Sequence, residues 1–232
     1  MLCFVDMEHE NVVKFPCTTL GDDKRIMHWG KRTELKFRFE QITGMVCVLQ
    51  HYTQITEKKL QEWNVRALLL SGCGTAWDRY DFSRCQELFR IIRGGNIPIM
   101  GLCGGHQFIG YAYDIPSGPL GLLPKGNKDP LPDASAGTLK EYGFTAVNIL
   151  HSDPLFEGLD NKPMFWENHK WGMQEIPPGF TLLASNEMCR IQAIRHKTHL
   201  VYGVQFHPEA YTEEQHDGMV LLMNFFRIAR VV

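Results

Sequence analysis

A cysteine surrounded by glycines follows a short apolar run in the middle of this 232-residue chain. The run 97–100 leads directly into the segment Gly101-Leu102-Cys103-Gly104-Gly105-His106-Gln107. A nucleophile at a tight turn between a strand and a helix often needs an unfavourable backbone conformation, and glycines beside it relieve the crowding. A helix that begins after Cys103 would point backbone N–H groups at the sulfur and favour the thiolate. The pattern indicates a nucleophile, although a small buried cysteine is the ordinary alternative, and it is our interpretation of the other six cysteines.

A histidine and a glutamate, His207 and Glu209, stand two residues apart about a hundred residues later, with Pro208 between them. Taken alone, each could be an ordinary side chain near the end of a strand. Together they can present an imidazole that takes the thiol proton of Cys103 and a carboxylate that orients the imidazole. The sequence therefore predicts a Cys-His-Glu triad.

The segment Ser71-Gly72-Cys73-Gly74 follows a third apolar run, Leu68–Leu70. A Gly-rich turn after a strand can offer backbone N–H groups to a developing oxyanion, which acyl transfer requires. Such glycines are also common for purely geometric reasons, so the segment alone decides nothing.

These residues resemble the motifs of the class I, or triad, glutamine amidotransferase family. Its nucleophile motif G-x-C-x-G-x-Q is met by Gly101, Cys103, Gly105 and Gln107, and its H-P-E motif by His207-Pro208-Glu209. The resemblance implies that Cys103 attacks the side-chain amide of glutamine to form a γ-glutamyl thioester. Backbone N–H groups of Cys73 and Gly104 would stabilise the oxyanion. The family's oxyanion loop usually reads S-G-G-P, so Cys73 departs from it.

The resemblance also extends to substrate recognition. The segment Glu167–Trp171 resembles the loop that holds the α-amino and α-carboxylate groups of glutamine in some members, so Asn168 and Trp171 are expected to bind substrate. Gln107 of the nucleophile motif and Gly72 of the Gly-rich turn complete the expected oxyanion and substrate-binding residues. The alternative for this aromatic stretch is a segment of the core, and the sequence does not choose between the two.

Three functions are compatible with this site. The first is a glutaminase that delivers ammonia to a separate synthase, because the length fits the triad domain and leaves no room for an acceptor domain. The second is a stand-alone γ-glutamyl hydrolase, since the same triad cleaves γ-glutamyl amides in related enzymes; Gly104 after the cysteine favours the first. The third is a non-catalytic binding module.

Composition narrows the choice of partners. The formal net charge is −2, with both signs interspersed, so we expect neither nucleic acid nor a membrane as a partner. Seven cysteines without C-x-x-C spacing indicate neither a disulfide framework nor a metal site, and a reducing cytoplasm fits best. No phosphate-binding loop is present, so no cofactor is expected.

Short apolar runs alternate with longer amphipathic ones, which is typical of an α/β fold with three layers and a mostly parallel central sheet. The chain is expected to form one domain, 1–232. Segment 115–138 is rich in proline and glycine and is expected to be a long loop. Strands are predicted at 2–5, 45–49, 66–70, 97–102, 145–149, 180–185, 191–196 and 200–206, and helices at 23–41, 56–63, 82–93, 105–113 and 212–230.

Overall fold

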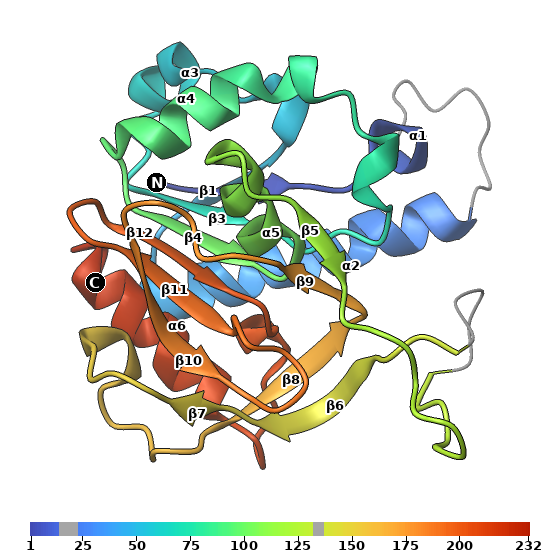
Figure 1. Ribbon diagram of the computed structural model, residues 1–232. Helices are drawn as coiled ribbons and strands as arrows, with labels where there is room; N and C mark the ends of the chain where they lie inside the picture. The colour runs from blue at the N-terminus through green and yellow to red at the C-terminus, as the bar shows by residue number, and fades with distance from the viewer. Residues whose placement is uncertain (14–22, 132–136) are drawn as a thin grey trace.

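The computed structural model describes residues 1–13, 23–131 and 137–232. An eight-stranded sheet forms its centre, with strand order β2-β1-β3-β4-β12-β11-β10-β7 (Figure 1). These strands are β1 (Leu2–Asp6), β2 (Cys47–His51), β3 (Ala67–Leu70), β4 (Ile99–Leu102), β7 (Asn148–Ile149), β10 (Phe180–Ser185), β11 (Ala193–His196) and β12 (Val201–Val204). The helices are α1 (Glu10–Val13), α2 (Asp23–Thr43), α3 (Glu57–Glu62), α4 (Gln86–Gly94), α5 (Gly104–Ala112) and α6 (Asp217–Ile228).

The half of the sheet that contains β2, β1, β3, β4 and β12 is parallel, whereas β11, β10 and β7 are antiparallel. Every residue of β3, β4 and β12 is buried. Continuous apolar runs form such strands because both faces of a parallel sheet are covered. The predicted α/β fold with a mostly parallel sheet is confirmed.

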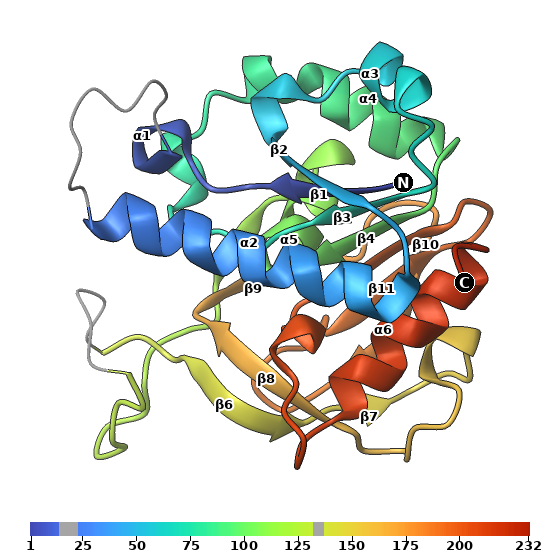
Figure 2. The same ribbon diagram turned by 180° about the vertical axis from the view of Figure 1, so that it is seen from behind.

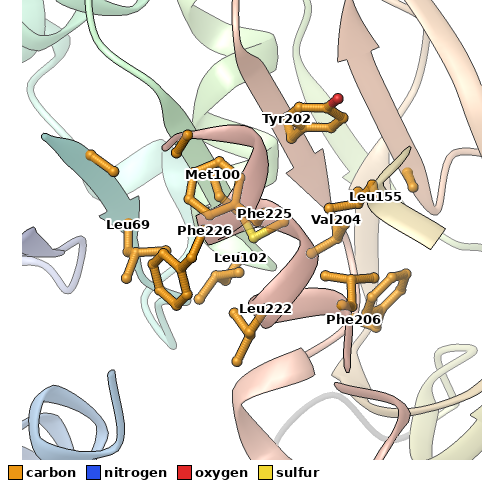
Figure 3. Close-up of a cluster of buried hydrophobic side chains, with 14 of the residues drawn as sticks. Leu69, Met100, Leu102, Leu155, Tyr202, Val204, Phe206, Leu222, Phe225 and Phe226 are labelled. Carbon is orange, nitrogen blue, oxygen red and sulfur yellow. The ribbon is translucent and has the colours of Figure 1, made fainter. Parts of the chain in front are cut away.

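Helices cover both faces of the sheet (Figures 1 and 2). Successive strand residues point to opposite faces, so Leu69 packs in the cluster with residues of α2 and α6, while Leu68 and Leu70 pack with residues of α3, α4 and α5. Figure 3 shows the first cluster, in which Phe225 and Phe226 of α6 contact the sheet. The two apolar layers fix the strand ends in place.

Two small antiparallel sheets lie beside the main one: β5 (Ser117–Pro119) with β9 (Trp171–Met173), and β6 (Glu141–Ala146) with β8 (Met164–His169). Here the structure differs from the sequence prediction in two respects. The strand predicted at 145–149 is divided between β6 and β7, and the predicted loop 115–138, of which 132–136 lie outside the described residues, contains β5. The segment 167–171, for which the sequence left a substrate-binding loop and a core segment open, lies mostly in β8 and β9. Short strands that pair only with distant segments leave little local signal.

The last helix begins at Asp217, later than the predicted 212. Thr212 and Gln215 close a turn on each other, with the backbone N–H of Thr212 donating to the carbonyl of Gln215 and that of Gln215 donating to the Thr212 hydroxyl. This side-chain hydrogen bond competes with helix formation. Among the residues described, no helix is both long and apolar enough to cross a bilayer.

Candidate active site

Three neighbouring parallel strands end at the site. β3 leads into Ser71–Thr75, β4 leads into Cys103, and β12 is followed within three residues by His207. Adjacent parallel strands carry their carboxyl ends to one edge of the sheet, where α/β proteins bind their ligands. The fold thus brings together the Gly-rich turn after β3, the Cys103 segment and the His-Pro-Glu segment, which are far apart in the sequence.

Cys103 occupies a strained turn between β4 and α5. Its φ is +49° and its ψ is −102°, and its backbone N–H donates to the Val204 carbonyl at 2.8 Å. A Cβ on Gly101 would lie 2.5 Å from the Gly105 carbonyl oxygen, and a Cβ on Gly105 would lie 2.3 Å from the Leu70 carbonyl oxygen. Only glycine permits this close approach, which confirms that the flanking glycines are needed for the turn. The sulfur consequently lies at the N-terminus of α5.

His207 connects the sulfur to Glu209. Its Nδ1 lies 2.7 Å from Oε1 of Glu209, and its ring lies beside Cys103. Since Nδ1 is used by Glu209, Nε2 is the nitrogen that serves the sulfur. Burial alone would lower the pKa of His207, but the Glu209 carboxylate and the Cys103 sulfur raise it well above its ordinary value. This arrangement favours the protonated imidazole next to the nucleophile.

The backbone of His207 is tied to a strand outside the main sheet. Its N–H donates to the Trp166 carbonyl at 2.8 Å, and Arg38 of α2 donates to the Glu209 carbonyl at 2.7 Å. A turn of 3-10 helix at Pro208–Ala210 brings Glu209 back beneath the imidazole. These contacts fix the position of the His207 imidazole relative to the Glu209 carboxylate.

The turn after β3 is held on both sides. Arg32 of α2 donates to the Gly72 carbonyl at 2.7 Å and to Asp6 at 2.9 Å, while Glu8 accepts from the backbone N–H groups of Gly74 and Thr75. In a trans peptide the C=O and the following N–H point in opposite directions, so fixing the Gly72 carbonyl directs the Cys73 N–H away from Arg32.

That N–H faces the nucleophile turn. A Cβ on Gly104 would lie 2.7 Å from the Cys73 nitrogen, and a Cβ on Gly72 would lie 3.5 Å from the Cys103 Cβ and 3.0 Å from the His207 ring. The Cys73 sulfur donates to the Thr75 carbonyl at 3.9 Å.

A cavity of about 570 Å³ opens at these strand ends. Its lining includes every residue that the sequence analysis assigned to the site: Gly72, Cys73, Cys103, Gly104, Gln107, Asn168, Trp171, His207 and Glu209. Asn168 is exposed at its rim, whereas Gln107 is buried. A larger cavity, about 730 Å³, lies at the opposite ends of β3 and β4 and contains none of them. The side chains of Cys103, His207 and Glu209, not the volume, make this cavity the candidate site.

The carboxamide of Gln107 is held entirely by the protein. Its Oε1 accepts from the Trp77 indole at 2.7 Å, and its Nε2 donates to the Trp171 carbonyl at 2.8 Å and to Gln205 at 3.1 Å. Gln205 in turn donates to the Cys103 sulfur at 3.5 Å. Sequence analysis missed Gln205, Trp77 and Arg32. Of these three residues, only Gln205 could have been suggested by the sequence, because it stands two residues before His207.

A buried ionic cluster lies beside the cavity. His169 contacts Glu141 at 3.0 Å and Glu167 at 3.2 Å through Nε2, and its Nδ1 lies 3.0 Å from the Trp171 carbonyl. Burial opposes the charged form, but the two carboxyl groups raise the pKa of His169 to about 10. The protonated ring thereby fixes the strand that lines the cavity.

Glu141, His169 and Cys189 are the described residues whose ligand atoms lie close enough to hold a metal, within 4.8 Å of one another. Glu141 also accepts from Gln192 at 2.9 Å, and Cys189 donates to the Ile191 carbonyl at 3.7 Å. Burial raises the pKa of Cys189 to about 12, so the thiol stays protonated. Because these groups already have protein partners, we assign no metal here.

Comparison with known proteins agrees with this geometry. The family model "Glutamine amidotransferase class-I" matches residues 34–229. The glutamine-hydrolyzing GMP synthase subunit of Pyrococcus abyssi is 35% identical over 145 residues, which is 62% of this chain and 66% of the relative. The corresponding protein of Methanocaldococcus jannaschii is 32% identical over 165 residues, 71% of this chain and 74% of the relative.

The matched stretch thus spans about two thirds of the length of these relatives. A solved structure from Thermoplasma acidophilum, of a protein described as a GMP synthase subunit, superposes with a TM-score of 0.69 at 25% identity, covering 99% of this chain and 94% of that one. The chain therefore belongs to the class-I glutamine amidotransferase family.

Proposed function

We propose that this chain is a glutaminase that hydrolyses the side-chain amide of glutamine through a thioester on Cys103 and supplies the ammonia to a separate GMP synthase-type subunit. The observation that carries the proposal is the meeting of Cys103, the His207–Glu209 pair and the turn at Gly72 and Cys73 at one cavity. The similarity to the glutamine-hydrolyzing subunits of GMP synthases supports the choice of acceptor.

In the first half-reaction the Cys103 thiolate adds to the amide carbon of glutamine. The carbonyl oxygen becomes an oxyanion, which the N–H groups of Cys73 and Gly104 stabilise. The protonated His207 then gives its proton to the leaving nitrogen, the C–N bond breaks, and ammonia departs. A γ-glutamyl thioester remains on Cys103.

In the second half-reaction His207, now neutral, takes a proton from water as the water oxygen adds to the thioester carbon. The C–S bond breaks, glutamate leaves and Cys103 returns as a thiolate. Glu209 keeps the imidazole in the same tautomer throughout and stabilises its charged form. Asn168 and Trp171 form the part of the cavity where the glutamine backbone groups would bind, and Gln107 holds the Trp171 carbonyl in place. The cavity volume suits a ligand of this size.

We place the enzyme in the cytoplasm. The six cysteines among the described residues are all free thiols, which agrees with a reducing compartment.

The test combines this protein with the GMP synthase-type synthase subunit of the same organism. We expect glutaminase activity to be low alone and to rise when the synthase and its substrates are added, with GMP formed from glutamine. Cys103→Ala should abolish glutamine-dependent GMP formation and leave ammonium-dependent formation intact. A high glutaminase rate that no synthase changes would contradict ammonia delivery, and steady hydrolysis of other γ-glutamyl amides with poor turnover of glutamine would instead establish a γ-glutamyl hydrolase.

A further inference from the structure

Gln205 lies directly beneath the sulfur of Cys103. Its side chain is completely buried, and Nε2 lies 3.5 Å from Sγ. We propose that the Gln205 side-chain amide is a fixed hydrogen-bond donor that stabilises the thiolate form of Cys103, both before attack and when the thioester breaks. The first part of the proposal concerns the free enzyme and can be tested without glutamine or a synthase; its second part rests on the proposed glutaminase reaction.

The hydrogen bonds around Gln205 decide which way its amide faces. The Trp77 indole can only donate, so its partner on Gln107 must be the oxygen. The NH₂ group of Gln107 therefore faces the Trp171 carbonyl and the side chain of Gln205. Gln205 must present its oxygen to this donor, which leaves its own NH₂ for the sulfur. A flipped Gln205 would set two NH₂ groups against each other and a carbonyl oxygen against the thiolate.

The backbone fixes the position of Gln205 as firmly as the network fixes its orientation. The residue follows β12 directly, and its N–H donates to the Gln192 carbonyl at 2.8 Å. A donor that is already oriented in a buried site needs no reorganisation when charge appears, and the low local dielectric strengthens the interaction.

Four titratable groups also interact electrostatically with Cys103. His207 and His169 are positive neighbours, and burial raises the pKa values of the Cys73 and Cys189 thiols, which keeps them neutral. Of the groups that favour the thiolate, His207 gives its proton to the leaving nitrogen in the proposed reaction and is then uncharged. The amide of Gln205 does not lose its proton, so it remains at the sulfur through both half-reactions. Gln205 can therefore donate to the Cys103 sulfur at the steps in which His207 has lost its proton.

The experiment measures the rate at which iodoacetamide alkylates Cys103 between pH 5 and pH 9, with mass spectrometry of the Cys103 peptide as the readout. Gln205→Met retains volume without a donor, and Gln205→Glu places an oxygen where the NH₂ was. We expect the midpoint of the alkylation profile to rise by about one pH unit in Gln205→Met, a tenfold change in the thiol–thiolate equilibrium, and further in Gln205→Glu. kcat should fall while KM changes little.

The matched control is Asn224→Leu. Asn224 is another buried carboxamide, on α6, and it donates to the carbonyls of Leu155 and Glu157 away from the cavity. The variant Asn224→Leu should have a lower melting temperature and the same alkylation midpoint as the wild type. An unchanged midpoint in a folded Gln205 variant, or an equal shift in the control, would overturn the proposal. Gln205→Glu is nearly isosteric and provides the test if Gln205→Met does not fold. The alkylation result is independent of the glutaminase proposal, because that assay contains no glutamine; only the expected fall in kcat rests on the glutaminase proposal.

Discussion

Gly104 and Cys73 lie so close together that a Cβ on Gly104 would be 2.6 Å from the Cys73 sulfur and 2.7 Å from its backbone nitrogen. The two residues follow different strands, β4 and β3, and the proposed oxyanion donors belong to them. The distance between these two turns sets the size of the oxyanion site.

Gly104→Ala should separate the two turns and weaken catalysis. We expect kcat for glutamine hydrolysis to fall about a hundredfold or more, as for the loss of one oxyanion donor. The control is Gly30→Ala, because Gly30 is exposed in α2 and its Cβ would meet nothing within 4 Å. That change should leave kcat intact and raise stability by up to about 1 kcal/mol. Equal activity of the two variants would remove Gly104 from the oxyanion site.

Glu209→Gln should lower the pKa of His207, because the carboxylate is one of the two groups that raise it. The amide preserves the shape of the carboxyl group but not its charge. We therefore expect kcat to fall less than in His207→Ala, which removes the acid and base altogether. NMR titration of the His207 ring and steady-state kinetics provide the measurements. Equal losses in both variants would leave the orienting role of Glu209 unsupported.

Cys103→Ser should also lower the pKa of His207, since the sulfur is the other group that raises it. A hydroxyl does not ionise near neutral pH and supplies no charge to the imidazolium. The pH titration of the ring in this variant reports the pairing directly, without substrate. A His207 titration that is the same as in the wild type would show that the imidazole does not sense the sulfur.

The pH dependence of stability should report His169. Its pKa is about 10 in the folded protein and about 6.5 in an unfolded chain, so the folded state binds more protons between these values. Stability should therefore decrease as pH rises from about 6.5 to about 10. In His169→Gln this decrease should be smaller, with the part due to His207 remaining, because the pKa of His207 is also raised in the folded protein. The variant should also be less stable at pH 6 by about 3 to 5 kcal/mol, because Glu141 loses its cation.

Urea unfolding at pH 6, 8 and 10 measures the effect of His169. The exposed residue His151 provides the control, and His151→Gln should follow the wild-type curve. Parallel curves for the wild type and His169→Gln would show that this histidine is not charged in the folded protein.

Arg32→Met should release the Gly72 carbonyl and leave Asp6 with one ionic partner fewer. We expect kcat to fall about tenfold to a hundredfold, because a small displacement of the oxyanion turn disturbs the reaction geometry. Arg66→Met is the control, since Arg66 donates to the Arg230 carbonyl at the other end of the sheet. Similar kcat values in the two variants would show that Arg32 does not position the turn.

The sequence by itself determined the nucleophile turn, the His-Pro-Glu segment and the alternation that builds the sheet. These depend on neighbouring residues: glycines one or two positions from Cys103, a two-residue spacing between His207 and Glu209, and apolar runs long enough for a buried strand. Local steric and solvation effects act over such short distances, so they can be read in order along the chain.

Tertiary structure alone decided what surrounds the triad. Gln205 reaches Cys103 across 102 positions of sequence, Arg32 reaches Gly72 across 40, and Glu141 reaches His169 across 28. Each partner is an ordinary polar residue in its own segment, and its role arises because two packed layers bring the segments together. A buried polar group must find a hydrogen-bond partner, but which partner it finds depends on the fold.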